Sequence, residues 1–208
     1  MSSTLNSFQH AIIPIAASSA TGDISRLTEH LDSALNQQLP ISMAKEVMVH
    51  LYAYVGFPRS LNALNTLMTL VDKRRDQGLN DVPGDVEQPE VVLPNSLQIG
   101  TENQTKLAGQ PVSGPLFSFA PAIDQFLKAH LFGDLFQRTQ LSWIDRELTT
   151  LSALSVLTGV ESQLKSHFQI SLNAGLTPTQ LHEFISILRL GYDPLAADSA
   201  EKILLSVL

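Results

Sequence analysis

The chain contains an internal repeat: residues 10–46 align without gaps on residues 147–183. The identical positions carry polar as well as apolar side chains, so the match is more than the periodicity that helices share. The identical pairs are Ala16 and Ala153, Ser18 and Ser155, Thr21 and Thr158, Gly22 and Gly159, Ser25 and Ser162, Leu27 and Leu164, His30 and His167, Leu35 and Leu172, Asn36 and Asn173, Leu39 and Leu176, and Glu46 and Glu183. Internal repeats constrain the architecture of the whole chain. We therefore predict two diverged copies of one unit.

Both copies have the spacing and end signals of helices. Ser142 with Asp145 forms a capping box at the start of a helix, and Thr177-Pro178 marks another start. Ser42 is the expected N-cap of the helix over 43–55, and Gly56-Phe57-Pro58 predicts a turn after that helix. We expect the Thr-Gly pairs of the repeat to end the first helix of each copy. The predicted helices cover residues 8–20, 23–37, 43–55, 58–76, 142–158, 161–174 and 121–138.

The segment 77–115 differs from the rest because glycine and proline recur along it. It is longer than an ordinary loop, and we predict an irregular strap, with a short strand at Val91–Leu93. The predicted fold is all-α, with two tandem helical repeats joined by this strap. The expected divisions are a first repeat over 1–76, the strap over 77–115 and a second repeat over 116–208.

Composition excludes several classes of function. The net charge of −7 argues against nucleic acid and anionic membranes as partners. The chain has no cysteine, which excludes disulfides, thiolate nucleophiles and zinc–sulfur sites. It has no HxH or HExxH spacing, and we expect no metal. No apolar run reaches the roughly 20 residues that span a bilayer, so we expect a cytoplasmic protein.

Glu46, His50 and Tyr54 lie four residues apart and so share one side of a helix. A carboxylate, an imidazole and a phenol in this order can form a proton relay. The alternative is a surface pair of Glu46 and His50, with Tyr54 packed in the core. The second copy keeps only the glutamate, as Glu183, which favours a structural role for that position.

Glu147 and His167 lie on the two helices that flank Thr158-Gly159. A carboxylate that orients a histidine is a recurrent acid–base device. The first copy keeps the histidine as His30 but has His10 in place of Glu147, so the second copy is the better-equipped site. The alternative is that His30 and His167 only pack.

Arg59 follows Pro58 at a helix start, where an arginine can anchor a carboxylate or form a structural ion pair. His130 has no identifiable partner in the sequence. Because the unshared residues are divided between the copies, we expect one composite site rather than two equal ones.

These residues resemble the carboxymuconolactone decarboxylase family. The run YAYVGFPRSLNAL from Tyr52 to Leu64 is similar to its signature. A second block of the family is matched by Arg146-Glu147-Leu148, Gly159-Val160-Glu161, His167, Leu172–Thr177 and Glu183. Phe119–Asp124 and His130–Asp134 are similar to bacterial members in which two such domains are fused.

The resemblance implies the all-α fold of alkylhydroperoxidase D and a homo-oligomer (a dimer, trimer or hexamer). The peroxidase branch of the family carries CxxC before its histidine. The matching positions are Val160 and Gln163 before His167, and Asp23 and Arg26 before His30, so this chain lacks both redox pairs.

The decarboxylase branch needs a cation for a carboxylate and an acid for the proton, without a cofactor. We therefore predict a cofactor-free lyase or isomerase for a small anionic cyclic or enolisable acid. His167, Glu147 and His50 are its candidate catalytic residues, and Arg59, Tyr54 and His30 are candidates for substrate binding. One alternative is a non-catalytic binding or assembly module. Another is a peroxidase-like antioxidant protein, but the absence of cysteine argues against it.

Overall fold

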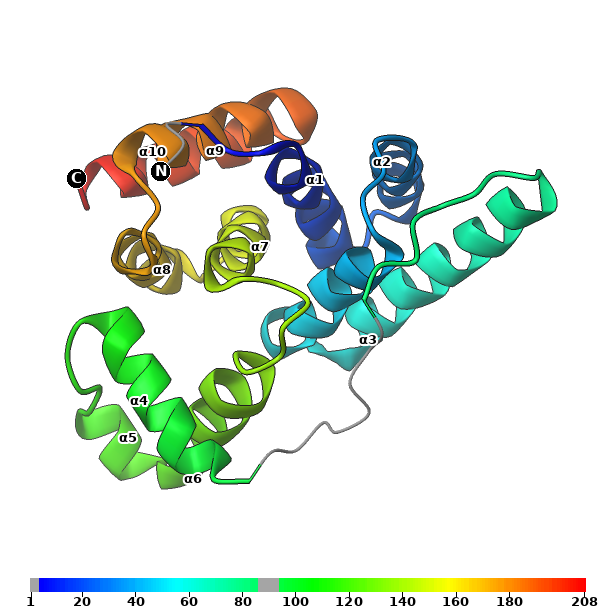
Figure 1. The fold of residues 1–208 in the computed structure, drawn as a ribbon. Helices are drawn as coiled ribbons and strands as arrows, with labels where there is room; N and C mark the ends of the chain where they lie inside the picture. The colour runs from blue at the N-terminus through cyan, green and yellow to red at the C-terminus, as the bar shows by residue number, and fades with distance from the viewer. Residues whose placement is uncertain (1–3, 86–93) are drawn as a thin grey trace.

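The computed structural model describes residues 4–85 and 94–208, and this part of the chain is helical without any strand (Figure 1). The prediction of an all-α fold is thereby confirmed. The helices are α1 Ser7–Thr21, α2 Ile24–Asn36, α3 Ile41–Asp76, α4 Ser96–Ala108, α5 Pro115–Phe119, α6 Pro121–Gln125, the π-helix η1 Phe126–Leu135, α7 Trp143–Val156, α8 Glu161–Ala174, α9 Pro178–Gly191 and α10 Pro194–Leu205.

The first repeat folds as α1, α2 and the first half of α3. The helix α1 ends at Gly22, whose left-handed conformation (φ 77°) satisfies the last carbonyls, as predicted. The helix α3 starts at Ile41, not after Ser42, because the carbonyls of Val82 and Pro83 accept the first two amide hydrogens. It breaks at Gly56 (φ 76°, ψ 164°), where the turn was predicted.

The second repeat folds as α7, α8 and α9. Ser142 and Asp145 form the predicted capping box of α7. That helix ends at Val156, so Gly159 (φ 78°) lies in the following loop and does not end it, in contrast to the expectation. The side chain of Thr177 caps α9, which has Pro178 at its first position.

The two repeats share one hydrophobic core. In Figure 1, α1 and α7 lie next to each other near the centre of the molecule, with α9 and α10 packed over them. Side chains of both repeats meet in one buried cluster, which includes Ile12, Met48, Leu148, Phe168 and Phe184. Neither repeat therefore has a separate core of its own.

Part of the expected irregular strap is helical, because α4 occupies Ser96–Ala108. The prediction that Gly100 breaks a helix is wrong. Gly100 lies inside α4, where that helix closely approaches η1. A Cβ atom there would lie 1.7 Å from the carbonyl oxygen of Lys128, and one on Gly133 would lie 2.4 Å from that of Ser96. The two glycines let α4 and η1 approach closely. The strand expected at Val91–Leu93 lies outside the described residues.

The helix predicted over 121–138 consists of α6 followed by η1, which has π-helical hydrogen bonding. Together α4, α5, α6 and η1 form an arm, drawn in green in Figure 1. Leu107, Phe132 and Phe136 form a second buried cluster between this arm and α8. The Asn173 side chain on α8 donates a hydrogen bond to the carbonyl of Leu107 (2.8 Å). The α4–η1 arm thereby covers α8.

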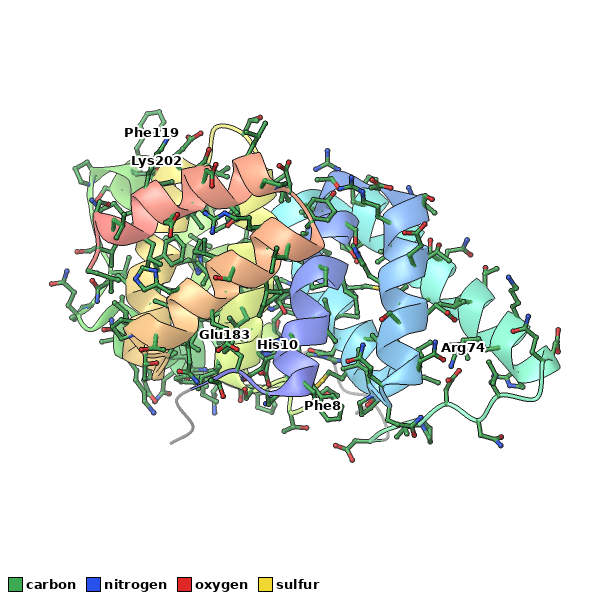
Figure 2. All side chains as sticks on the ribbon, turned by 90° about the horizontal axis from the view of Figure 1, so that it is seen from above. Phe8, His10, Arg74, Phe119, Glu183 and Lys202 are labelled. Atoms are coloured by element: carbon green, nitrogen blue, oxygen red, sulfur yellow. The ribbon has the colours of Figure 1, made fainter. Side chains whose placement is uncertain are left out.

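At the end of the molecule away from the α4–η1 arm, Arg74 joins α3 to neighbouring segments (Figure 2). Its buried guanidinium binds Asp81 (2.7 Å) in the segment after α3 and Asp32 (2.6 Å) on α2. Among the described helices, none combines the length and the apolar character needed to cross a membrane.

Candidate functional site

The candidate site lies where α3 of the first repeat meets α7 and α8 of the second. The spacing of Glu46, His50 and Tyr54 places them on one side of α3, and this side faces α7. Glu46 and His50 are fully buried, and Tyr54 is partly buried. The alternative of a surface pair of Glu46 and His50 is therefore wrong.

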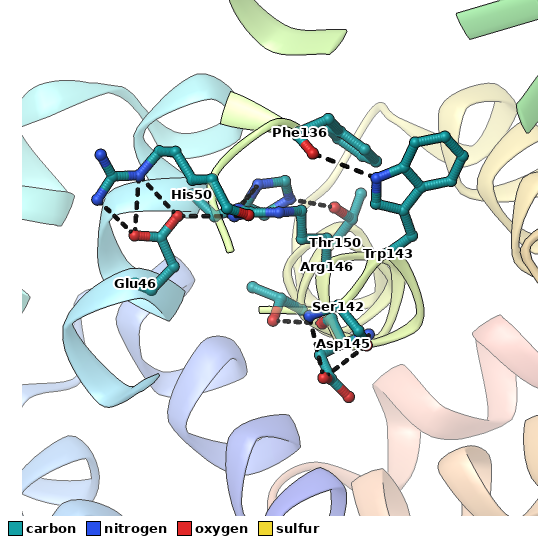
Figure 3. A network of polar contacts seen from close by, with 10 residues as sticks. Glu46, His50, Phe136, Ser142, Trp143, Asp145, Arg146 and Thr150 are labelled. Carbon is teal, nitrogen blue, oxygen red and sulfur yellow. Dashed lines mark hydrogen bonds and ion pairs between the residues drawn. The ribbon is translucent and has the colours of Figure 1, made fainter. Parts of the chain in front are cut away.

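Glu46 forms a buried ion network with two arginines (Figure 3). Arg138 donates to both carboxylate oxygens through Nε (2.9 and 3.0 Å) and to Oε2 through Nη2 (2.8 Å). Arg146 donates to Oε1 (2.8 Å) and to the carbonyl of Arg138 (2.9 Å). One carboxylate therefore holds two guanidinium groups in a place that water does not reach.

His50 lies between this network and Thr150. Its Nε2 is 3.0 Å from Thr150 Oγ1, and its Nδ1 is 3.4 Å from Arg146 Nη1. Burial, and then the charges of Arg146 and His167, hold the pKa of His50 well below its usual value. His50 is thus a neutral imidazole. It does not contact Glu46 directly as the proposed relay required, because the Arg146 guanidinium lies between them.

Glu147 and His167 meet across α7 and α8. The carboxylate Oε2 lies 2.8 Å from His167 Nδ1, and the carboxylate is fully buried, while His167 is 9% exposed. The other carboxylate oxygen, Oε1, is buried without a hydrogen bond in the described chain. The contact fixes the imidazole so that Nε2 is the nitrogen left for other partners.

Tyr54 lies between His50 and His167. Its ring lies 5.4 Å from that of His50 and 5.7 Å from that of His167, centroid to centroid. Its hydroxyl is buried near Thr150, without a hydrogen bond of good geometry among the described residues. Burial, and then the charge of Glu147, raise the pKa of the phenol, so it stays protonated and can act as a donor.

Two of the predicted site residues lie elsewhere. Arg59 is exposed on the part of α3 that follows the Gly56 break, and no hydrogen bond or ion pair in the described chain joins it to His167. The break turns this segment so that Ser60, not Arg59, points inward and donates to the carbonyl of Met48 (2.6 Å). His30 lies in the first repeat, 3.2 Å from the hydroxyl of Ser18.

Arg138, Arg146 and Thr150 were not predicted from the sequence as site residues. The available signal was the position of Arg138 just before the capping-box helix and of Arg146 within it. The chain has only 13 lysines and arginines, so two arginines this close together were notable. The partner of His130 was not predicted either: His130 Nδ1 lies 2.9 Å from Asp134 Oδ2 on η1.

The site offers a carboxylate-held imidazole, a phenol and a guanidinium in a mostly buried setting. Arg146 Nε is buried without a hydrogen bond among the described residues. These are groups for proton transfer and for binding an anion. Within 4–85 and 94–208, no three histidine or acidic side chains are grouped so that they could hold a metal ion.

Comparison with known proteins gives one result for the second repeat. Residues 121–198 match the model of a family described as the carboxymuconolactone decarboxylase family. The match includes η1, α7, α8 and α9, and therefore Arg146, Glu147 and His167, but not α3. A search of curated proteins gave no match.

Proposed function

We propose that this chain, whose residues 121–198 match the model of the carboxymuconolactone decarboxylase family, is a cofactor-free acid–base enzyme. Its substrate would be a small anionic cyclic or enolisable acid, and its reaction a decarboxylation. The observation that carries the proposal is the contact between Glu147 and His167, because a buried carboxylate that orients an imidazole prepares it for proton transfer.

In the proposed reaction, the bond between the substrate carboxylate and its α-carbon breaks, and the electron pair is delocalised into a conjugated carbonyl of the substrate, which gives an enolate. Carbon dioxide leaves. Protonated His167 then delivers the proton on Nε2 to that carbon, while Glu147 stabilises the imidazolium through Nδ1. Solvent returns the proton to His167, so no oxidant or reductant is needed.

Arg146 is the cation best placed to attract the anionic substrate toward the buried end of the site. Its Nε lacks a hydrogen bond in the described chain, and it lies beside His50, which carries no charge to oppose it. Tyr54 can donate to the enolate oxygen because its pKa is raised by burial. Arg146 thus takes the part that the sequence analysis assigned to Arg59.

The test is a decarboxylation assay on lactone carboxylates of the muconolactone type, followed by carbon dioxide release. We expect His167→Ala to lower kcat by a factor on the order of 10²–10⁴, the usual contribution of a general acid. His182→Ala is the matched control, because His182 is exposed on α9 outside the site. Equal activity of the two variants would refute the assignment.

A non-catalytic binding or assembly module is the second candidate, and the burial of the ion network favours it. Glu46, Arg138 and Arg146 are all nearly inaccessible, as expected if they only hold the repeats together. Release of no carbon dioxide from any substrate, together with strong destabilisation by Glu46→Gln, would support this candidate. The cysteine-free sequence argues against a peroxidase.

The expected partners are the anionic substrate and further copies of the chain. Large exposed apolar side chains on the α4–η1 arm support self-association, notably Leu116, Phe119 (88% exposed) and Phe126. Sedimentation of the wild-type chain beside Phe119→Asp tests it: the variant should shift to a smaller species.

A further inference from the structure

A hollow of about 290 Å³ lies between α1 and α2 of the first repeat. It is lined by, among others, His10, Ala11, Pro14, His30, Ser33 and Gln37. This volume is just below the range of about 300–1,000 Å³ that is usual for small-molecule sites. The proposed reaction does not use this hollow.

The hollow is the repeat counterpart of the candidate site in the second copy. The six lining residues named above align, in the same ungapped register, with Glu147, Leu148, Leu151, His167, Ile170 and Ala174. The second-copy positions are mostly buried, because the α4–η1 arm and Tyr54 cover them. The first-copy positions stay accessible: His10, Ser33 and Gln37 are exposed.

Gly191 is the reason why the first-copy hollow is not filled from α9. It aligns with Tyr54, whose ring packs beside His167 in the second copy. A Cβ atom on Gly191 would lie 3.9 Å from Pro14 Cβ, which is an ordinary contact. A side chain is therefore sterically allowed at this position, next to Pro14, which lines the hollow.

The hollow offers hydrogen bonds but no net positive charge. Burial lowers the pKa of His30, so its imidazole is neutral near pH 7. His10 Nε2 lies 2.8 Å from a carboxylate oxygen of Glu183, which balances any charge on His10 (Figure 2). Ser33 and Gln37 add a hydroxyl and an amide, and Ala11 and Pro14 add an apolar wall. Such a lining suits an uncharged molecule with one apolar face and a few polar groups.

We propose that the hollow between α1 and α2 is a second ligand site, which binds a small uncharged ring compound bearing hydroxyl or carbonyl groups. The site is a binding site and not a second catalytic centre, since it has His10 where the second copy has Glu147.

The test is an NMR titration of the full chain with phenol, catechol and γ-butyrolactone as uncharged probes and benzoate as the anionic comparison. We expect at least one uncharged probe to shift the amide signals of 10–13 and 30–37, and benzoate to bind more weakly. Gly191→Tyr, which introduces the aromatic side chain that Tyr54 provides beside His167, should raise Kd at least about tenfold, a change of about 1.4 kcal/mol in binding free energy. Gly191→Ala is the matched control and should keep the wild-type Kd.

Ser33→Trp places a large side chain at another lining residue of the hollow and should have the same effect if Gly191→Tyr fails to fold. His167→Ala should leave probe binding unchanged, so failure of the proposed enzyme activity and failure of this site are distinguishable. The proposal is overturned if no uncharged probe shifts these signals, if benzoate binds more tightly, or if both filling variants bind like the wild type. A smaller species of Gly191→Tyr in sedimentation would also overturn it, since a second copy would then occupy the hollow.

Discussion

Replacing Glu46 by glutamine tests whether the buried ion network stabilises the fold. The carboxylate is 1% exposed and accepts four hydrogen bonds, three from Arg138 and one from Arg146. Glutamine has nearly the same shape, but it offers one acceptor oxygen and turns an amide N–H₂ toward a guanidinium. Two buried cations are then left without a counter-charge.

The expected cost follows from this burial. Removing one partner of a buried ion pair destabilises a protein by about 3–5 kcal/mol. For a chain of this length, that loss corresponds to a decrease in Tm of roughly 6–20 °C. Glu183→Gln is the matched control, because Glu183 is the repeat counterpart of Glu46. The Glu183 side chain is 23% exposed and the His10 side chain that it contacts is 45% exposed, so the loss of this contact should cost at most about 1 kcal/mol.

The assay is urea unfolding and thermal unfolding of both variants beside the wild type, followed by circular dichroism at 222 nm. The double variant Glu46→Gln with Arg138→Met should recover part of the stability, since it removes one uncompensated cation. If Glu46→Gln and Glu183→Gln lose the same free energy of unfolding, the network does not stabilise the fold and the reasoning from burial is wrong.

Two further predictions concern pH and the arm. Because the folded chain keeps His50 neutral, only the unfolded chain takes up this proton below about pH 6.5, so stability should fall toward pH 5 by about 1.4 kcal/mol per pH unit. His50→Asn should flatten this slope in urea titrations, and an unchanged slope would contradict it. Gly100→Ala should separate α4 from η1, because its Cβ would meet the carbonyl of Lys128, at a cost of about 1–3 kcal/mol. Faster hydrogen exchange across α4 would report this, and wild-type protection would refute it.

Local signals in the sequence predicted several helix ends. Gly22, the Ser142 capping box and the Gly56 break each act through contacts within a few residues, so the sequence alone reveals them. The helix α4 was missed for the opposite reason. Whether Gly100 breaks a helix or lets two helices touch depends on η1, which lies about 30 residues away along the chain.

The candidate site was accessible from the sequence only where helix geometry decides it. The spacing within α3 places Glu46, His50 and Tyr54 on one side, and that inference needs no tertiary structure. The position of Arg146 between Glu46 and His50 depends on how α7 packs against α3, which no local pattern encodes. The exposure of Arg59 likewise depends on the direction that the chain takes after Gly56.

Each of the two glutamates that the repeats share contacts a side chain of the other repeat. Glu46 of the first binds Arg146 at the start of α7, and Glu183 of the second binds His10 on α1, one repeat position further along. Each half thus carries a glutamate whose side-chain partner belongs to the other half. The halves of this chain, expressed as separate fragments, should remain incompletely folded alone and recover helical structure when mixed.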